Sequence, residues 1–225
     1  MLHQLAPLPY AVDALEPHID ARTMTLHHDM HHAAYVKALN TVLSSAPESL
    51  RDQTPAWLMS NLSQAPMAIR NELRHQAGGH LNHSLLWASM SPTGGGEPSA
   101  ALSVALARDF SSIAAFKTRF EQAGAKHFGA GWVWLVVGPS PQLGLHILTT
   151  DEHESPLTDG YQPLLVNDLW EHAYYLKHEN RRPDYLHGWW SVVDWNAATE
   201  RLANAVCAAQ DAPHGEAATV LEAVH

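Results

Sequence analysis

The segment Leu26-His27-His28-Asp29-Met30-His31-His32-Ala33-Ala34-Tyr35 carries the densest group of metal-binding side chains in this sequence. In a helix, His27, His31 and Tyr35 follow one another at intervals of four residues and therefore share one face. His28 and His32 form a second stripe, about a hundred degrees around the helix. Two histidines four residues apart are a common metal-chelating pair, but a solvated helix face rich in histidine has the same spacing. The segment by itself leaves both interpretations open.

Two further segments offer the same kinds of ligand. The first is His80-Leu81-Asn82-His83, which follows the pair Gly78-Gly79. The second runs from Asn167 to Tyr175, where Asp168 follows a predicted strand and His172 comes four residues later. Neutral imidazole nitrogens and a carboxylate oxygen suit iron, manganese or zinc. A surface histidine or an ordinary structural pair explains each segment alone, but three separated segments with one ligand chemistry together favour a metal site.

The composition bounds the class of protein. The chain has 225 residues, of which 17 are His, and 13 Lys and Arg against 23 Asp and Glu give a net charge of −10. This acidic balance disfavours general nucleic-acid binding, while eight Trp and 46% hydrophobic residues argue against disorder. The single Cys207 excludes a disulfide scaffold within the chain. The sequence has no apolar run long enough for a membrane span and no recognisable secretory signal, so we expect a cytoplasmic protein.

Proline and glycine divide the chain into predicted regions. Residues 1–90 are predicted to form a helical hairpin domain, with one arm starting near Leu15 and reaching about Leu43 and the other spanning about 66–90. Residues 91–98, rich in Pro and Gly, are the predicted linker. Residues 99–203 are predicted to form the C-terminal domain, and the Ala-rich residues 204–225 a flexible tail.

The C-terminal domain combines helical and strand patterns. Helical spacing covers 99–128 and returns at 183, and between these lie β-branched and aromatic runs typical of strands. A hairpin is predicted for residues 132–138 and 143–149, which are joined by a turn at Pro139-Ser140-Pro141. A third strand is predicted for residues 163–167. The predicted fold class is α+β, with a long antiparallel helical hairpin followed by an α/β domain that has a small three-stranded antiparallel sheet and flanking helices.

These segments, in this order, resemble the iron/manganese superoxide dismutase family over residues 3–203. The motifs that carry the resemblance are Leu8-Pro9-Tyr10, Ala14-Leu15-Glu16-Pro17-His18, His27-His28-x-x-His31-His32-x-x-Tyr35, Ala77-Gly78-Gly79-His80-x-Asn82-His83-Ser84, Phe128-Gly129-x-Gly131-Trp132-x-Trp134-Leu135, Asp168-x-Trp170-Glu171-His172-Ala173-Tyr174-Tyr175 and Asn180-Arg181-Arg182-Pro183-Asp184-Tyr185. Several long motifs in the family's order make a chance match negligible.

The resemblance implies a role for each matched position. The implied metal ligands are His27, His83, Asp168 and His172. The implied catalytic residues around the substrate funnel and the metal-bound solvent are His31, Tyr35 and His153. The implied aromatic wall is Trp87, Trp132, Trp134 and Trp170. Glu171 and Tyr175 would bridge the interface of a homodimer, with a tetramer left open, and Arg181 would steer substrate.

The implied reaction converts two superoxide anions and two protons to dioxygen and hydrogen peroxide. One iron or manganese ion per subunit would alternately gain and lose one electron. The solvent molecule bound to the ion would alternate between hydroxide and water. Each electron is then accompanied by a proton, so the net charge of the buried site stays constant, and an uncompensated buried charge would be costly. Zinc, which is not redox-active, could not run this cycle.

Three features depart from the family pattern. Met30 stands where many members have Lys, which weakens attraction of an anion and leaves more of the steering to Arg181. His153 stands where the family places Gln, and we expect it to set the redox potential through a hydrogen bond to the metal-bound solvent. His75-Gln76 replaces a common Asn-Asn pair, and the chain extends past the usual end; neither change suggests a chemistry from sequence.

Two other functions remain open at this stage. The first is a metal-binding protein of the same fold with little or no dismutase turnover, which the histidine-rich surface and Met30 favour. The second is a zinc hydrolase, which the ligand types permit. The second is disfavoured because the sequence has no His-Glu-x-x-His motif and no evident general base. Iron or manganese as the metal is undecided.

Overall fold

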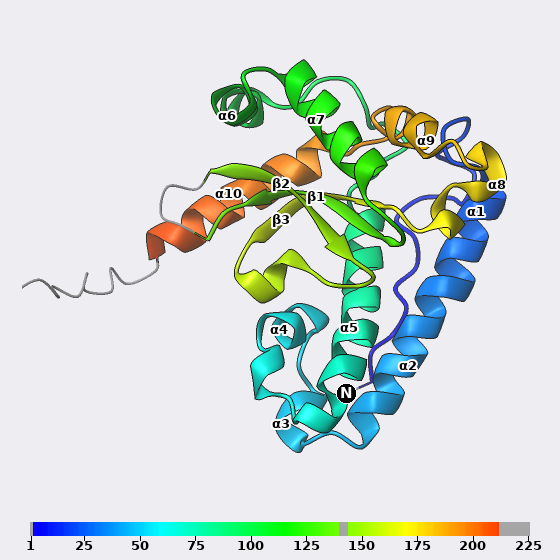
Figure 1. Cartoon of the computed structure of the whole chain (residues 1–225), viewed down its shortest axis with the longest axis vertical. Coiled ribbons are helices and arrows are strands. Elements are labelled where there is room, and N and C mark those ends of the chain that lie inside the picture. The colour runs from blue at the N-terminus through cyan, green and yellow to red at the C-terminus, as the bar shows by residue number, and fades with distance from the viewer. Residues whose placement is uncertain (1, 140–143, 212–225) are drawn as a thin grey trace, which may run out of the picture.

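Two long helical arms form the first half of the chain, as a computed structural model of residues 2–139 and 144–211 shows (Figure 1). The first arm joins α1 (Ala21–Leu26), the π-helical turn η1 (His27–His32) and α2 (Ala33–Ser44). The second arm is α5 (Met67–Trp87), which lies antiparallel beside α2. The arms are connected through α3 (Glu48–Arg51), α4 (Pro55–Ser60) and the 3-10 turn η2 (Leu62–Gln64).

The first arm begins later than its apolar spacing predicts. The side chain of Asp20 accepts a hydrogen bond from the backbone N–H of Thr23 at 2.8 Å, which caps the helix at Ala21. Leu15 and Ile19, where the helical pattern starts in the sequence, are buried in the turns before this cap. Leu15 and Ile19 are therefore apolar because they are buried in the core, and not because they belong to the helix.

Three antiparallel strands form one sheet in the order β2-β1-β3. The strands are β1 (Gly131–Val137), β2 (Leu145–Asp151) and β3 (Gln162–Asp168). The central strand β1 is buried along its whole length, and its Trp132 pairs in register with Asp168 at the end of β3. Residues 140–143, which include part of the predicted turn, lie outside the described residues.

Helices flank this sheet (Figure 1). The predicted helical stretch 99–128 consists of two helices, α6 (Ala100–Phe110) and α7 (Ile113–Lys126), because Ser111 adopts a φ of +76° between them. After the sheet come the 3-10 turn η4 (Glu171–Ala173) and the helices α8 (Tyr175–His178), α9 (Arg182–Trp189) and α10 (Trp195–Asp211). The short 3-10 turn η3 (Pro156–Asp159) connects β2 to β3.

The C-terminal tail is shorter than predicted. Helix α10 continues to Asp211, so residues 204–211 are helical, and Ala205 is buried in the core. An Ala-rich segment is a strong helix former, and the side chain of Ala205 packs in the core cluster around the sheet. Residues 212–225 lie outside the described part of the chain.

The predicted fold class is confirmed: a helical hairpin is followed by a domain with a three-stranded antiparallel sheet and flanking helices. One hydrophobic cluster lies between the hairpin arms and α4, around Leu39, Leu58 and Leu73. A larger cluster surrounds the sheet and includes Trp132 and Trp134. None of the helices in the described part of the chain is both long and apolar enough to cross a bilayer.

Candidate metal centre

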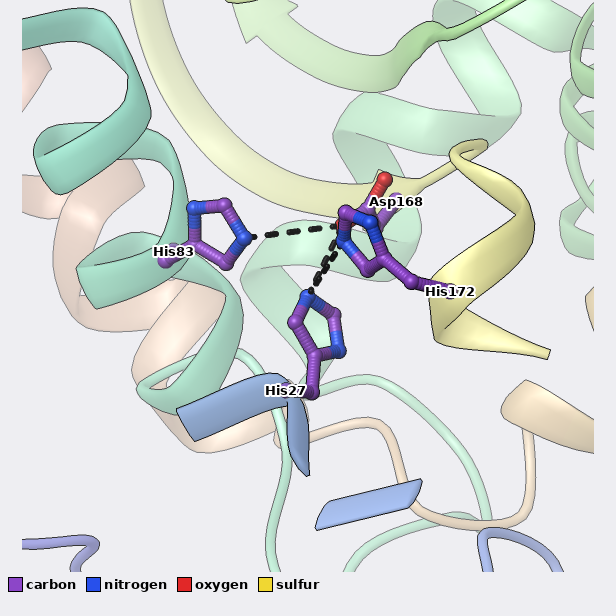
Figure 2. Close-up of side chains that lie close together, drawn as sticks. All are labelled: His27, His83, Asp168 and His172. Atoms are coloured by element: carbon purple, nitrogen blue, oxygen red, sulfur yellow. Dashed lines mark hydrogen bonds and ion pairs between the residues drawn. The ribbon is translucent and has the colours of Figure 1, made fainter. Parts of the chain in front are cut away.

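Four ligand-type side chains from four separate elements meet where the hairpin joins the sheet (Figure 2). His27 begins η1, His83 lies in α5, Asp168 ends β3 and His172 lies in η4. One ligand atom from each lies within 4.8 Å of the others. The Nε2 atoms of His27, His172 and His83 lie 3.0, 3.2 and 3.8 Å from Oδ2 of Asp168.

His83 provides the clearest test of whether a metal ion fits. Its Nδ1–H donates to the carbonyl oxygen of Gly79 at 2.6 Å, so the neutral ring carries a lone pair on Nε2. This Nε2 is fully buried and, within the described residues, has no hydrogen-bond partner. It faces the carboxylate of Asp168, which is another acceptor. A buried lone pair directed at a carboxylate is costly unless a cation lies between them, so these residues fit a bound metal ion.

The electrostatics of the pocket give the protonation states that a metal requires. Burial favours the neutral carboxyl of Asp168, but His172 and His27 outweigh it and lower the pKa of this group. Burial lowers the pKa of His27 to about 4, and burial together with the neighbouring His27 lowers the pKa of His83. At neutral pH the pocket therefore holds a carboxylate and neutral imidazoles, the forms that bind metal ions.

The π turn η1 distributes the histidines of the opening segment. The N–H of Ala33 bonds to the carbonyl oxygen of His28, five residues earlier, which inserts one extra residue into the helical turn. His27 lies in the ligand pocket, His31 is exposed at its rim, and His28 and His32 are buried outside it. Of the histidine pairs at four-residue spacing, His27 alone supplies a ligand atom to the pocket.

His31 and Tyr35 cover the ligands on the solvent side. The ring of His31 stacks on that of His172, with centroids 4.1 Å apart. The ring of Tyr35 stacks on that of His83 at 5.4 Å and meets His153 edge-on at 4.4 Å. Burial raises the pKa of Tyr35 to about 12, so its hydroxyl stays protonated at neutral pH. The structure therefore brings both predicted funnel residues against the ligand side chains.

His153 is buried beside the ligands rather than exposed in a surface loop. The indole N–H of Trp132 donates to its Nδ1 at 3.3 Å, and its ring stacks on that of Trp170 at 4.6 Å. Burial lowers the pKa of His153 to about 3, so the ring is neutral. With Nδ1 accepting, the proton of the neutral ring lies on Nε2, which has no partner within the described residues. His153 therefore has a buried N–H available as a hydrogen-bond donor.

Three of the four predicted tryptophans line the ligands directly. Trp87 lies edge-on to His27 at 4.8 Å, Trp132 edge-on to His83 at 5.0 Å, and Trp170 stacks on His172 at 5.7 Å. Trp134 lies behind Trp132, at 6.2 Å, and its indole N–H donates to Thr150. It supports the wall instead of forming part of its inner surface.

The pair Gly78-Gly79 allows two close approaches to α5. A Cβ at position 78 would collide with the carbonyl oxygen of His153, and a Cβ at position 79 would lie 2.6 Å from the ring of Tyr35. The backbone of His153 and the ring of Tyr35 can therefore approach the helix only where it has no side chains. This is the packing reason for two glycines inside a helix.

The remaining predicted site residues lie on the surface. Glu171 and Tyr175 are exposed. Arg181 is also exposed, and its guanidinium pairs with Glu179 at 3.0 Å and Asp184 at 3.2 Å. The structural ion pair is thus present, and it reduces the positive charge that Arg181 offers to an approaching anion.

Sequence reasoning missed a second histidine network behind the ligands. The indole N–H of Trp87 donates to Nδ1 of His32 at 3.0 Å, and Nε2 of His32 lies 2.7 Å from Nδ1 of His80. His32 also stacks on the ligand His83 at 5.3 Å. The sequence signal was the four-residue spacing of His28 and His32, but spacing alone does not separate a buried support from a solvated face.

Comparison with known proteins agrees with this geometry. Residues 2–91 match the α-hairpin domain of iron/manganese superoxide dismutases, and residues 98–201 match the C-terminal domain of the same proteins. A manganese superoxide dismutase of Leptolyngbya boryana is 48% identical over 204 residues, 90% of this chain and 81% of the relative. That of Pseudomonas aeruginosa is 45% identical over 206 residues, 92% of this chain and all of the relative. Two matched domains and near-complete coverage leave one conclusion: the chain belongs to the iron/manganese superoxide dismutase family.

Proposed function

We propose that this protein is a superoxide dismutase that converts two superoxide anions and two protons to dioxygen and hydrogen peroxide. One iron or manganese ion per subunit would be held by His27, His83, Asp168 and His172. The observation that carries the proposal is the convergence of three imidazole nitrogens and one carboxylate oxygen, with Nε2 of His83 buried and, among the described residues, without a partner. When bound, the ion would supply the one-electron oxidation and reduction.

The chain's own residues provide the electrostatics and the protons. Three neutral imidazoles and one carboxylate leave the bound cation with a residual positive charge, which attracts an anionic substrate. The tryptophans exclude water, so charges in the site interact more strongly than they would in solvent. Tyr35 keeps its hydroxyl proton at neutral pH, and neutral His153 presents an N–H, so both act as hydrogen-bond donors to the site.

Manganese is supported by the two relatives compared above, which are manganese superoxide dismutases, and by Gly79. Manganese-type members of the family also have Gly at this position. Iron is supported by His153, which replaces the family's Gln. We therefore propose that the site accepts either ion, with manganese preferred.

A homodimer is the proposed assembly. Glu171 and Tyr175, which match family residues that bridge two subunits, are exposed beside the ligand His172. Phe128 is 97% exposed and Leu176 is 50% exposed. Large apolar side chains at high exposure are typical of an interaction surface.

The single Cys207 leaves the chain without an internal disulfide, which supports the further proposal that the protein works in the cytoplasm.

Metal reconstitution tests the proposed function. The metal-free protein is loaded separately with manganese, iron and zinc, and metal content and superoxide decay are measured on each sample. We expect about one ion per subunit in each case and rapid decay with manganese or iron, but not with redox-inert zinc. Stoichiometric loading with near-background decay for both manganese and iron would instead identify a metal-binding protein without dismutase turnover.

A further inference from the structure

A surface pocket of about 360 Å³ lies beside the candidate metal centre, on the face of α5 that carries His75. Its lining includes Glu72 and His75 from α5, and Glu152, His153 and Glu154 from the segment that follows β2. His153 is only 1% exposed and also contacts Tyr35, so the inner wall of the pocket is a residue of the site itself. A single side chain therefore separates the solvent in this pocket from the residues of the metal centre.

His75 is that intervening side chain. It is 36% exposed, and its Nδ1 lies 3.8 Å from Oε2 of Glu152. Its ring meets His153 edge-on, with centroids 5.0 Å apart, and Tyr35 edge-on at 5.9 Å. One ring therefore contacts the solvent pocket, an exposed carboxylate and both hydrogen-bond donors of the site.

The other charged groups around His75 are already paired. Arg74 forms an ion pair with Glu154, and Glu72 accepts a hydrogen bond from the side chain of Gln76. Glu152 is the carboxylate that faces the His75 ring, and it adopts a φ of +46°, which is unfavourable for a residue with a side chain. A carboxylate therefore lies beside the His75 ring.

The reaction needs a proton source at this place. Two protons are consumed for each pair of superoxide anions, and a donor in the site must be reprotonated before the next turnover. His153 is buried and Tyr35 is only partly exposed, whereas His75 lines the solvent pocket. Histidine is also the side chain whose ordinary pKa lies nearest to neutral pH.

We propose that His75 supplies protons from the surface pocket to Tyr35, an inference that rests on the proposed dismutase activity. After Tyr35 has given up its hydroxyl proton in turnover, the imidazolium of His75 gives a proton to the phenolate oxygen of Tyr35 and becomes a neutral imidazole, and a water or buffer acid in the pocket then restores the proton of His75. No electron moves in this step. His75 thus acts through other residues and does not touch the substrate.

The variant His75→Asn tests the proposal, because Asn is polar but cannot carry the proton. The control is His187→Asn in α9, which removes an exposed histidine whose partner is Glu121 of α7. We expect His75→Asn to lower kcat at least about tenfold at pH 7.5 while kcat/KM changes little. Added imidazole buffer should restore the kcat of this variant with increasing concentration, and leave wild type and control unchanged. Metal content and the unfolding midpoint should match wild type.

A second readout does not depend on turnover. In the metal-free protein, the NMR signals of the Tyr35 and His153 rings should follow the titration of His75, and this response should disappear in His75→Asn. An unchanged kcat, a loss that imidazole does not restore, or ring signals that ignore His75 would each overturn the assignment. Wild type without turnover in either metal would contradict the dismutase function and this assignment together.

Discussion

His153 is the single residue in the site at which this chain departs most from its family. Trp132 donates to its Nδ1 and Trp170 stacks on its ring, so the orientation of the imidazole is held from two sides. A Gln at this place would also be a donor, but it has a smaller and more flexible side chain with different polarity. We expect His153→Gln to shift the reduction potential of the bound ion by about 60 mV or more, a tenfold change in a one-electron equilibrium. Redox titration of the manganese and iron forms measures this, and unchanged potential and activity with both metals would refute the role.

The family resemblance implies that Arg181 steers the substrate. The two ion pairs of Arg181 limit that role. Its positive charge still contributes to the electric field around a chain whose net charge is −10, whereas Met30 carries no charge. We expect Arg181→Gln to lower kcat/KM about twofold at low ionic strength, and less at 0.15 M salt, where charges are screened beyond about 8 Å. Rate measurements across a salt series check this. A loss that is independent of salt would instead indicate a structural ion pair.

At the scale of elements, α5 depends on Gly78 to accept the segment that carries His153. A methyl group at Gly78 would collide with the carbonyl oxygen of His153, which is backbone and cannot rotate away. We expect Gly78→Ala to lower the free energy of unfolding by about 1–3 kcal/mol, the usual cost of overpacking, and to alter the spectrum of the bound metal as His153 moves. Gly188→Ala in α9 is the matched control, because a Cβ there meets nothing within 4 Å.

That control should be neutral or slightly stabilising, since Ala is a better helix former than Gly. Chemical denaturation of both variants, with the metal removed, gives the two free energies. If Gly78→Ala unfolds at the wild-type denaturant concentration, the packing of α5 against the His153 segment is looser than the structure shows.

The elements also show which parts of the protein could be predicted from sequence. Strands β1 to β3 and both hairpin arms follow from β-branched runs and helical spacing, which are local properties. The π turn at His27–His32 could not be predicted, because the four-residue spacing of its histidines is the same in an α-helix. The buried bond between His32 and His80 joins residues 48 positions apart, and it depends on how α5 packs against η1.

At the scale of the whole molecule, the excess of histidine makes the stability of the protein depend on pH. Burial lowers the pKa of His32 to about 3, of His80 to about 4 and of His153 to about 3. In the unfolded chain each of these rings has an ordinary pKa near 6.5. Between about pH 6.5 and pH 3 the unfolded state therefore binds more protons than the folded state. The free energy of unfolding must then fall as the pH is lowered through this window.

The expected size of this effect is several kcal/mol, because each unit of pKa difference corresponds to about 1.4 kcal/mol and these three residues contribute together with the buried His27 and His83. Chemical denaturation of the metal-free protein at pH 7.5, 6, 5 and 4 measures it, and stability should be highest at pH 7.5. His32→Asn combined with His80→Asn removes two of these groups and should flatten the curve, even if it lowers the stability at pH 7.5. A curve as steep as that of wild type would show that His32 and His80 do not control acid unfolding in this pH range.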